Sequence, residues 1–214
     1  MRSRWLGFLI VGLAVVISAW AYPRLPINVA THWNLSGEPN GYSSRLVAVL
    51  LVPTVVLLLS SVLRIVPRLY RQRDRSGLID TFWLILNTIF LFLLAIHVVV
   101  IGNGVGAPIR VGQLIPIGIG ILFVLFGGIL GSVKPNQFLG IRTPWTVSSE
   151  RVWYKTHRTG QWLLAAAGLF LVVSSFAPRI TTFAILVPIL VVVVVTPVAQ
   201  SYILWTREQS GAND

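Results

Sequence analysis

The chain has 214 residues, of which 55% are hydrophobic and 11% charged, with a formal net charge of +11. So small a polar fraction cannot cover a soluble globule, and the apolar residues occur in long blocks, which indicates an integral membrane protein. The absence of cysteine excludes disulfides and thiolate chemistry. Attraction to an anionic lipid bilayer explains the positive charge, so we expect no direct binding of nucleic acid.

Six apolar runs are long enough to cross a bilayer. A helix rises 1.5 Å per residue, so about 20 residues cross the hydrocarbon layer of about 30 Å. No period-two alternation is evident, which favours a helical bundle over a membrane barrel. We therefore predict an all-α polytopic membrane protein with about six transmembrane helices. The expected spans are 5–22, 46–66, 78–101, 111–133, 161–177 and 183–205.

These spans divide the chain into four parts. The first two spans enclose a loop at 23–45, which we call the first loop. The third and fourth spans form the second part, and the third part holds a polar segment at 134–160 followed by the last two spans. A short tail ends the chain. The four parts are 1–66, 67–133, 134–205 and 206–214.

The lysine and arginine residues predict the orientation. Cytoplasmic loops keep positive charge during membrane insertion. Most of the 17 basic residues lie on the side of the amino terminus, and the opposite side has only Arg24, Arg45, Arg110 and Arg179. We therefore expect both termini, and the polar segment, to be cytoplasmic.

The first span carries a small-residue pattern, Ala19 and Ala21, that would also fit a cleaved secretory signal. Its apolar stretch is longer than the usual signal core of about 7 to 15 residues. Trp20 suits an interfacial anchor. Both features favour a retained span over a cleaved signal.

The first loop is rich in turn-forming residues, and Asn40 with Gly41 is its strongest turn pair. Its aromatic residues suit the headgroup level, so we predict a loop that folds back onto the outer membrane surface. His32 and Glu38 are two candidate metal ligands without a third, which favours a hydrogen-bonded surface histidine.

The third span contains Asp80 and Asn87, which are seven residues apart and share a helical face. An intramembrane carboxylate is costly, about 3 kcal/mol at a helix centre, and often serves function. Asp80 is close to the arginine-rich segment that precedes it, so a structural salt bridge or helix cap is the favoured interpretation. A proton or ion relay is the alternative, and it would make the protein a small-solute or ion-coupled transporter.

The fourth span has Gly120, Gly127 and Gly131 on one face, which predicts close helix packing within the bundle or between subunits. The sequence contains no phosphate loop, zinc-binding helix, nucleophile elbow or pair of catalytic aspartates. We therefore expect no enzymatic activity, no cofactor and no metal.

The polar segment predicts an extended stretch at 140–145, because Thr143 precedes a proline. A helix should begin near Ser148, with Glu150 in its first turn, where the helix dipole favours an anion. We interpret it as a cytoplasmic interfacial helix, with cations toward lipid phosphates and tryptophans at the interface. One face carries Arg151, Lys155 and Arg158, and the opposite face carries Trp153, Thr156, His157 and Gly160.

Two motifs resemble a known family. GIRTPWT at 140–146, followed by SSERVWYKTHRTG, resembles the signature of the SdpI family of bacterial membrane immunity proteins. The stretch 25–45, LPINVATHWNLSGEPNGYSSR, is similar to the first-loop module, of DUF1648 type, that accompanies that signature. Asn40 replaces an expected aspartate and Gln161 an expected glycine. The first departure removes a carboxylate from the first loop.

The resemblance implies an immunity or toxin-resistance protein of a bacterial or archaeal plasma membrane. It implies a secreted antimicrobial peptide as the outer partner and, for signalling, a small transcriptional repressor held at the membrane inside. The implied outer recognition residues are His32, Trp33, Gly37 and Pro39. The implied cytoplasmic signature and partner-docking residues are Arg142, Thr143, Pro144, Trp145, Glu150, Trp153, Lys155, His157 and Arg158.

Overall fold

The computed structural model describes all residues except 1–3, 35–36, 66–75, 137, 178–181 and 212–214. The chain forms two compact units, Met1–Gly118 and Ile119–Asp214. Five helical segments among the described residues are long and apolar enough to cross a membrane. The prediction of a helical, multi-pass membrane protein is therefore confirmed. These segments are Leu6–Arg24, Arg45–Val62, Gly77–Gly104, Val111–Ser132 and Leu186–Ser210.

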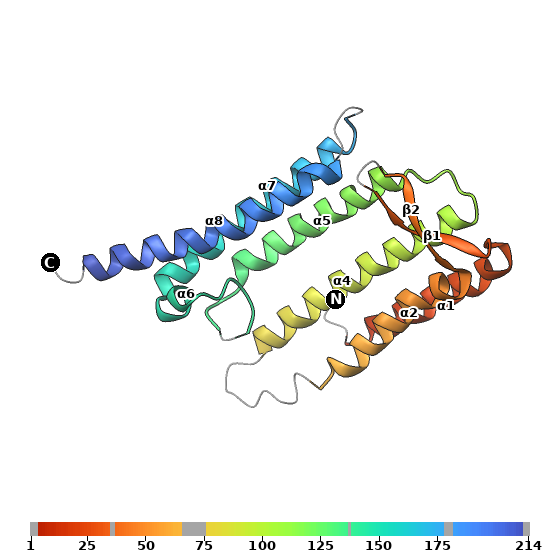
Figure 1. Cartoon of the computed structure of the whole chain (residues 1–214). Coiled ribbons are helices and arrows are strands. Elements are labelled where there is room, and N and C mark those ends of the chain that lie inside the picture. Colours follow the sequence, from red (N-terminus) through yellow and green to blue (C-terminus); the bar gives the residue numbers. More distant parts are fainter. Residues whose placement is uncertain (1–3, 35–36, 66–75, 137, 178–181, 212–214) are drawn as a thin grey trace. The chain divides into compact units, whose positions relative to one another are not determined.

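In the described part of the first unit, α1 (Leu6–Ala21), α2 (Arg45–Val62) and α4 (Ser76–Gly104) pack against one another. Figure 1 shows α1 and α2 side by side. Helices in lipid associate through close packing and small residues rather than through the hydrophobic effect. Gly7 meets this need, because a Cβ atom there would overlap the Ser60 hydroxyl of α2. The core of the three helices consists of Ile10, Val52, Val56, Trp83, Leu86 and Phe90.

The first loop, which we predicted as a turn-rich loop folding back onto the outer membrane surface, forms a β-hairpin. After the short 3-10 helix η1 (Tyr22–Arg24), strand β1 (Asn28–Trp33) pairs antiparallel with β2 (Pro39–Ser44). The turn uses Gly37, whose φ of +78° favours glycine. Asn40 and Gly41, the predicted turn pair, lie inside β2 instead. The pairing is irregular on both sides of His32, so simple alternation is lost.

The hairpin is anchored on the helices of its own unit. Leu25 and Val29 are buried in a second cluster with residues of α1, α2 and α4. A Cβ atom at Gly104 would lie 2.6 Å from Leu25 Cδ2 and 3.1 Å from Val29 Cγ1, so the close packing of the hairpin on the end of α4 favours a glycine there. The helical members of this cluster are Ala21, Ala48, Val49 and Ile101.

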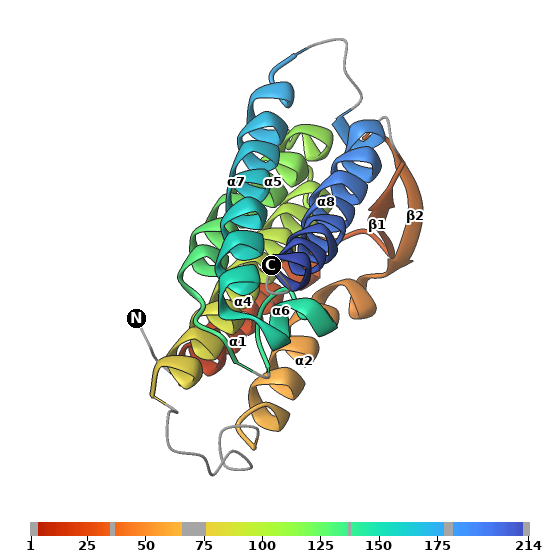
Figure 2. The ribbon, with the colours of Figure 1, turned by 90° about the vertical axis from the view of Figure 1, so that its left-hand side faces the viewer.

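The second unit contains the end of α5 (Val111–Ser132), then α6 (Pro144–Ser148), α7 (Glu150–Ser174) and α8 (Thr182–Ser210). Figure 2 shows α7 and α8 running alongside each other. The glycine face of α5 packs on α7, as predicted: a Cβ atom at Gly120 would lie 2.5 Å from the Gly168 carbonyl oxygen. At Gly127 it would lie 2.8 Å from the Gln161 carbonyl oxygen.

Helix α7 joins two segments that we expected to be separate. The predicted interfacial helix and the predicted span 161–177 form one helix, Glu150–Ser174. Gly160 lies within this continuous helix, and close packing favours a small residue there, because a Cβ atom would lie 2.8 Å from side-chain atoms of both Leu130 and Ile141. Charged residues in its first turns explain why α7 is not among the five apolar candidates.

Candidate functional site

The polar segment begins with a loop organised by one side chain. The Asn136 Nδ2 group donates to the carbonyl oxygens of Lys134 at 2.8 Å and Leu139 at 3.0 Å. Its Oδ1 accepts from the backbone N–H groups of Phe138 and Leu139, each at 2.7 Å. Both N–H donors and both acceptor positions of the Asn136 amide thus form hydrogen bonds within the loop. The chain leaves this loop at Gly140.

Gly140 brings the loop onto α7. Its φ of +114° lies in the region that favours glycine, and a Cβ atom there would overlap Nε2 of His157. This close approach lets the Ile141 N–H donate to His157 Nε2 at 3.0 Å. Since Nε2 accepts, the proton of the neutral ring is on Nδ1, which donates to the Trp153 carbonyl oxygen at 2.8 Å.

The bond from the Ile141 N–H requires a neutral His157, whereas the Nδ1–H bond to the Trp153 carbonyl would persist in the protonated ring. A second proton on Nε2 would remove the acceptor for the Ile141 N–H. Burial lowers the pKa of the His157 imidazole, and the bond to the Trp153 carbonyl offsets part of that effect. The histidine is therefore suited to hold the loop at neutral pH and to lose this contact when it is protonated.

Trp153 connects the start of α7 to the end of α5. Its ring stacks on His157 with 4.1 Å between centroids, and its Nε1–H donates to the Val133 carbonyl oxygen at 2.9 Å. Both side chains are fully buried. The interpretation of Trp153 as an interfacial tryptophan is therefore wrong. As core residues, Trp153 and His157 shape the polar segment and are not part of its outer surface.

Helix α6 is fastened at its first turn to α8. Thr143 caps it: its Oγ1 accepts from the Thr146 N–H at 3.1 Å and lies 3.1 Å from the Ser201 hydroxyl. The Trp145 ring lies 5.0 Å from that of Tyr202. Thr143 is extended, as predicted, but the helix starts at Pro144, where a proline is well tolerated. The next helix is capped by Ser149, one residue beyond the predicted start.

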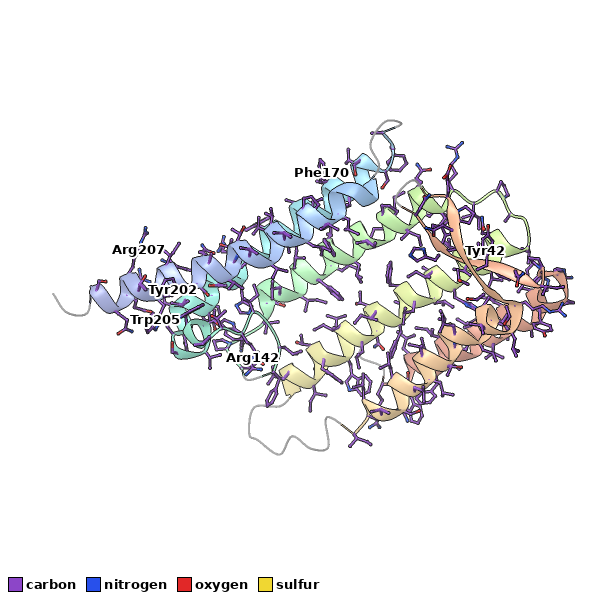
Figure 3. All side chains as sticks on the ribbon, in the orientation of Figure 1. Tyr42, Arg142, Phe170, Tyr202, Trp205 and Arg207 are labelled. Carbon is purple, nitrogen blue, oxygen red and sulfur yellow. The ribbon has the colours of Figure 1, made fainter. Side chains whose placement is uncertain are left out.

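The exposed residues of the polar segment include charged side chains and also the hydrophobic residues Phe138, Val147 and Tyr154. Figure 3 shows Arg142 at the same end of this unit as Tyr202, Trp205 and Arg207. The predicted docking set thus separates into three groups by exposure. Trp153 and His157 are buried and Thr143 and Trp145 are half-buried, while the exposed members are Arg142, Pro144, Glu150, Lys155 and Arg158.

The predicted outer recognition residues on the hairpin also differ in their exposure. His32 is exposed, with Nδ1 2.6 Å from the Asn40 Oδ1, so the expected hydrogen-bonded surface histidine is confirmed. Pro39 is exposed and Trp33 is half-buried, whereas Gly37 serves the turn. Tyr42, the one aromatic residue of β2, is 61% exposed (Figure 3).

Helix α4 carries the predicted intramembrane polar residues. Asn87 is buried and Asp80 is half-buried. His97 is also buried: its Nε2 lies 3.0 Å from the Ser18 hydroxyl, which donates to the Val49 carbonyl oxygen at 2.9 Å. This contact joins α1, α2 and α4. The arginine-rich segment that we expected to pair with Asp80 lies outside the described residues.

Comparison with known proteins places the two candidate sites in named regions. Residues 132–201 match the SdpI/YfhL protein family. This region of the chain is therefore similar to the SdpI/YfhL protein family. Residues 9–57, which include the hairpin, match a domain of unknown function, DUF1648. Two of the hydrogen bonds described above involve residues near the ends of the matched region 132–201, which we call the SdpI region. Trp153 donates to Val133 near its start, and Thr143 contacts Ser201 at its end.

A curated relative extends this likeness over most of the chain. Immunity protein SdpI of Bacillus subtilis (strain 168) is 23% identical over 176 residues, which cover 82% of this chain and 83% of that protein. No solved structure matches the chain.

Sequence reasoning missed three residues that organise the SdpI region: Asn136, Gly140 and Ser201. Asn136 and Gly140 carry a local signal, because an asparagine after Lys-Pro and a nearby glycine are typical of a tight turn. Ser201 carries none, since it lies 58 positions from its partner Thr143.

Proposed function

We propose that this protein is a membrane immunity protein that protects the cell from a secreted antimicrobial peptide. The observation that carries the proposal is the likeness to Immunity protein SdpI, which extends over 82% of the chain. The distribution of basic residues supports cytoplasmic termini, and this orientation directs the hairpin outward and the polar segment inward.

The hairpin is the proposed surface for the peptide. His32 and Tyr42 are exposed on a hairpin that is anchored on its helices through Leu25 and Val29. An aromatic side chain offers large contact area at low entropic cost, which suits it to be an anchor for a peptide. Binding there acts on the packing of α1, α2 and α4, since all three contribute to the cluster under the hairpin.

The polar segment is the proposed surface for the second, signalling function. A peptide that prefers one packing of the helices shifts their equilibrium toward it. The exposed residues Arg142, Lys155 and Arg158 then dock a small transcriptional repressor that recognises the altered surface. Trp153 and His157 are buried beneath this surface and hold its backbone in place.

A transporter is the second candidate, and buried Asn87 is the observation that favours it. Polar residues inside membrane helices often mark a path for ions or protons. The two candidates differ in their dependence on residues: transport requires Asp80 and Asn87, whereas immunity requires the hairpin.

Survival of a sensitive bacterial host tests the proposal. Cells that express the intact protein are challenged with a panel of secreted antimicrobial peptides, and we expect protection against at least one. Tyr42→Ala and His32→Ala should abolish that protection at equal membrane abundance, measured by immunoblot. Tyr154→Ala is the matched control, because Tyr154 is a comparably exposed tyrosine, at 50%, outside the hairpin. Equal killing with and without the protein across the panel would refute immunity.

A further inference from the structure

A small pocket lies between the first turns of α7 and the last turns of α8. Its volume is about 190 Å³. Typical small-molecule sites measure about 300 to 1,000 Å³, so this pocket suits a single compact polar group. Its lining residues are Arg151, Val152, Lys155, Leu204, Arg207 and Glu208, all in the second unit.

Three cations converge on this pocket from two helices. Arg151 and Lys155 are four residues apart on α7 and share a face, and Arg207 comes from α8. Among the described residues, none of the three forms an ion pair with an acidic side chain. Guanidinium groups bind phosphate oxygens through paired, charge-assisted hydrogen bonds. The charges and size of the pocket therefore select a phosphate group.

Glu208 adds a second requirement. Its Oε2 is buried and has no hydrogen-bond partner within the described part of the chain. A buried carboxylate oxygen without a donor is destabilising, and beside a phosphate it is also repelled. A ligand that places an ammonium or hydroxyl group on Glu208 satisfies this oxygen while its phosphate contacts the cations.

We propose that the pocket binds a phosphate ester that also carries a hydrogen-bond donor. The phosphate is bound by Arg151, Lys155 and Arg207, and the donor is bound by Glu208. Two sources share this chemistry: the headgroup of a bilayer phospholipid and a soluble phosphate ester. The pocket shares Lys155 with the proposed repressor-docking surface but has no residue in common with the hairpin, so the proposal does not rest on binding of the antimicrobial peptide.

Binding to the purified full-length protein in detergent tests the site. The probes are inorganic phosphate, phosphoethanolamine and dihexanoyl phosphatidylethanolamine, measured by isothermal titration calorimetry. We expect phosphoethanolamine to bind more tightly than inorganic phosphate. Arg207→Gln and, separately, Lys155→Gln should each weaken its binding about tenfold, as expected for loss of a hydrogen bond to a charged group. Arg158→Gln is the matched control, since Arg158 is an exposed cation of α7 that does not line the pocket.

Glu208→Gln tests the contact with the hydrogen-bond donor of the ligand separately from the attraction between the cations and the phosphate. It should remove the preference for phosphoethanolamine while inorganic phosphate binds as well as before or more tightly. Tighter binding of the short-chain lipid than of phosphoethanolamine assigns the site to a headgroup, and equal binding assigns it to a soluble ester. Absence of binding to the wild-type protein, or equal losses in Arg158→Gln and Arg207→Gln with native circular dichroism, would overturn the proposal.

Discussion

Replacement of Gly140 by alanine tests the contact that holds the polar segment on α7. The new Cβ atom would overlap Nε2 of His157 and lie 3.2 Å from Trp153 Cζ2. The φ of +114° at this position adds backbone strain of about 1 to 3 kcal/mol for a residue other than glycine. If the loop moves away to relieve the overlap, the Ile141 N–H loses its acceptor, which costs about 1 to 3 kcal/mol.

The backbone strain and the lost hydrogen bond do not add in full, because movement of the loop relieves the overlap while it breaks the bond. We therefore expect Gly140→Ala to lower the free energy of unfolding by about 2 to 4 kcal/mol. The measurement is denaturant unfolding in detergent followed by circular dichroism, with hydrogen exchange at the Ile141 amide as a local readout. That amide should exchange faster in the variant.

Gly128→Ala is the matched control. Apart from its chain neighbours and the nearby backbone of its own helix, no heavy atom of the described residues lies within 4 Å of a Cβ atom at position 128, which is inside helix α5. Alanine in a helix is more favourable than glycine by about 0.5 to 1 kcal/mol, so this variant should be as stable as the wild type or slightly more stable. Wild-type stability and unchanged exchange at Ile141 in Gly140→Ala would refute the close contact.

Three further predictions concern other parts of the chain. Because burial lowers the pKa of His157, the stabilisation that its neutral ring provides should be complete above pH about 6.5 and be lost as the pH falls through the lowered pKa. His157→Gln should remove this dependence of the free energy of unfolding on pH. A wild-type protein that becomes more stable in acid would contradict the prediction. Gly168→Ala places a Cβ atom against the Gly120 carbonyl oxygen and should destabilise by about 1 to 3 kcal/mol in the same unfolding assay, with an unchanged midpoint as the opposing result. Asp80→Asn should leave protection from the peptide intact at normal membrane abundance, and its loss would favour transport.

The helices were predictable because their signals are local. A run of about 20 apolar residues is sufficient for membrane insertion, whatever the rest of the chain does. Periodicity also placed Trp153, Thr156, His157 and Gly160 on one face of α7, as the structure has them, but this face is buried in the protein, whereas we expected its tryptophan at the membrane interface. The packing of Gly120 and Gly127 on α7 agrees with the predicted glycine face.

The secondary-structure predictions were wrong where one local sequence feature is compatible with two structures. A proline favours an extended residue before it but also suits the first position of a helix, and Pro144 does both. The change from charged to apolar residues near Gly160 indicated a boundary, although the backbone of α7 continues through it. In the hairpin, irregular pairing around His32 hides the alternation by which strands are detected.

The sequence by itself determined that this protein inserts apolar helices into a membrane, and its motifs indicated the SdpI family. Only the tertiary structure decided which polar residues are interior. Periodicity places His157 and Trp153 on one face but does not identify their partners, the Ile141 N–H and the Val133 carbonyl. These partners are 16 and 20 positions away in sequence, and the Ile141 N–H reaches His157 because Gly140 permits the backbone to approach α7.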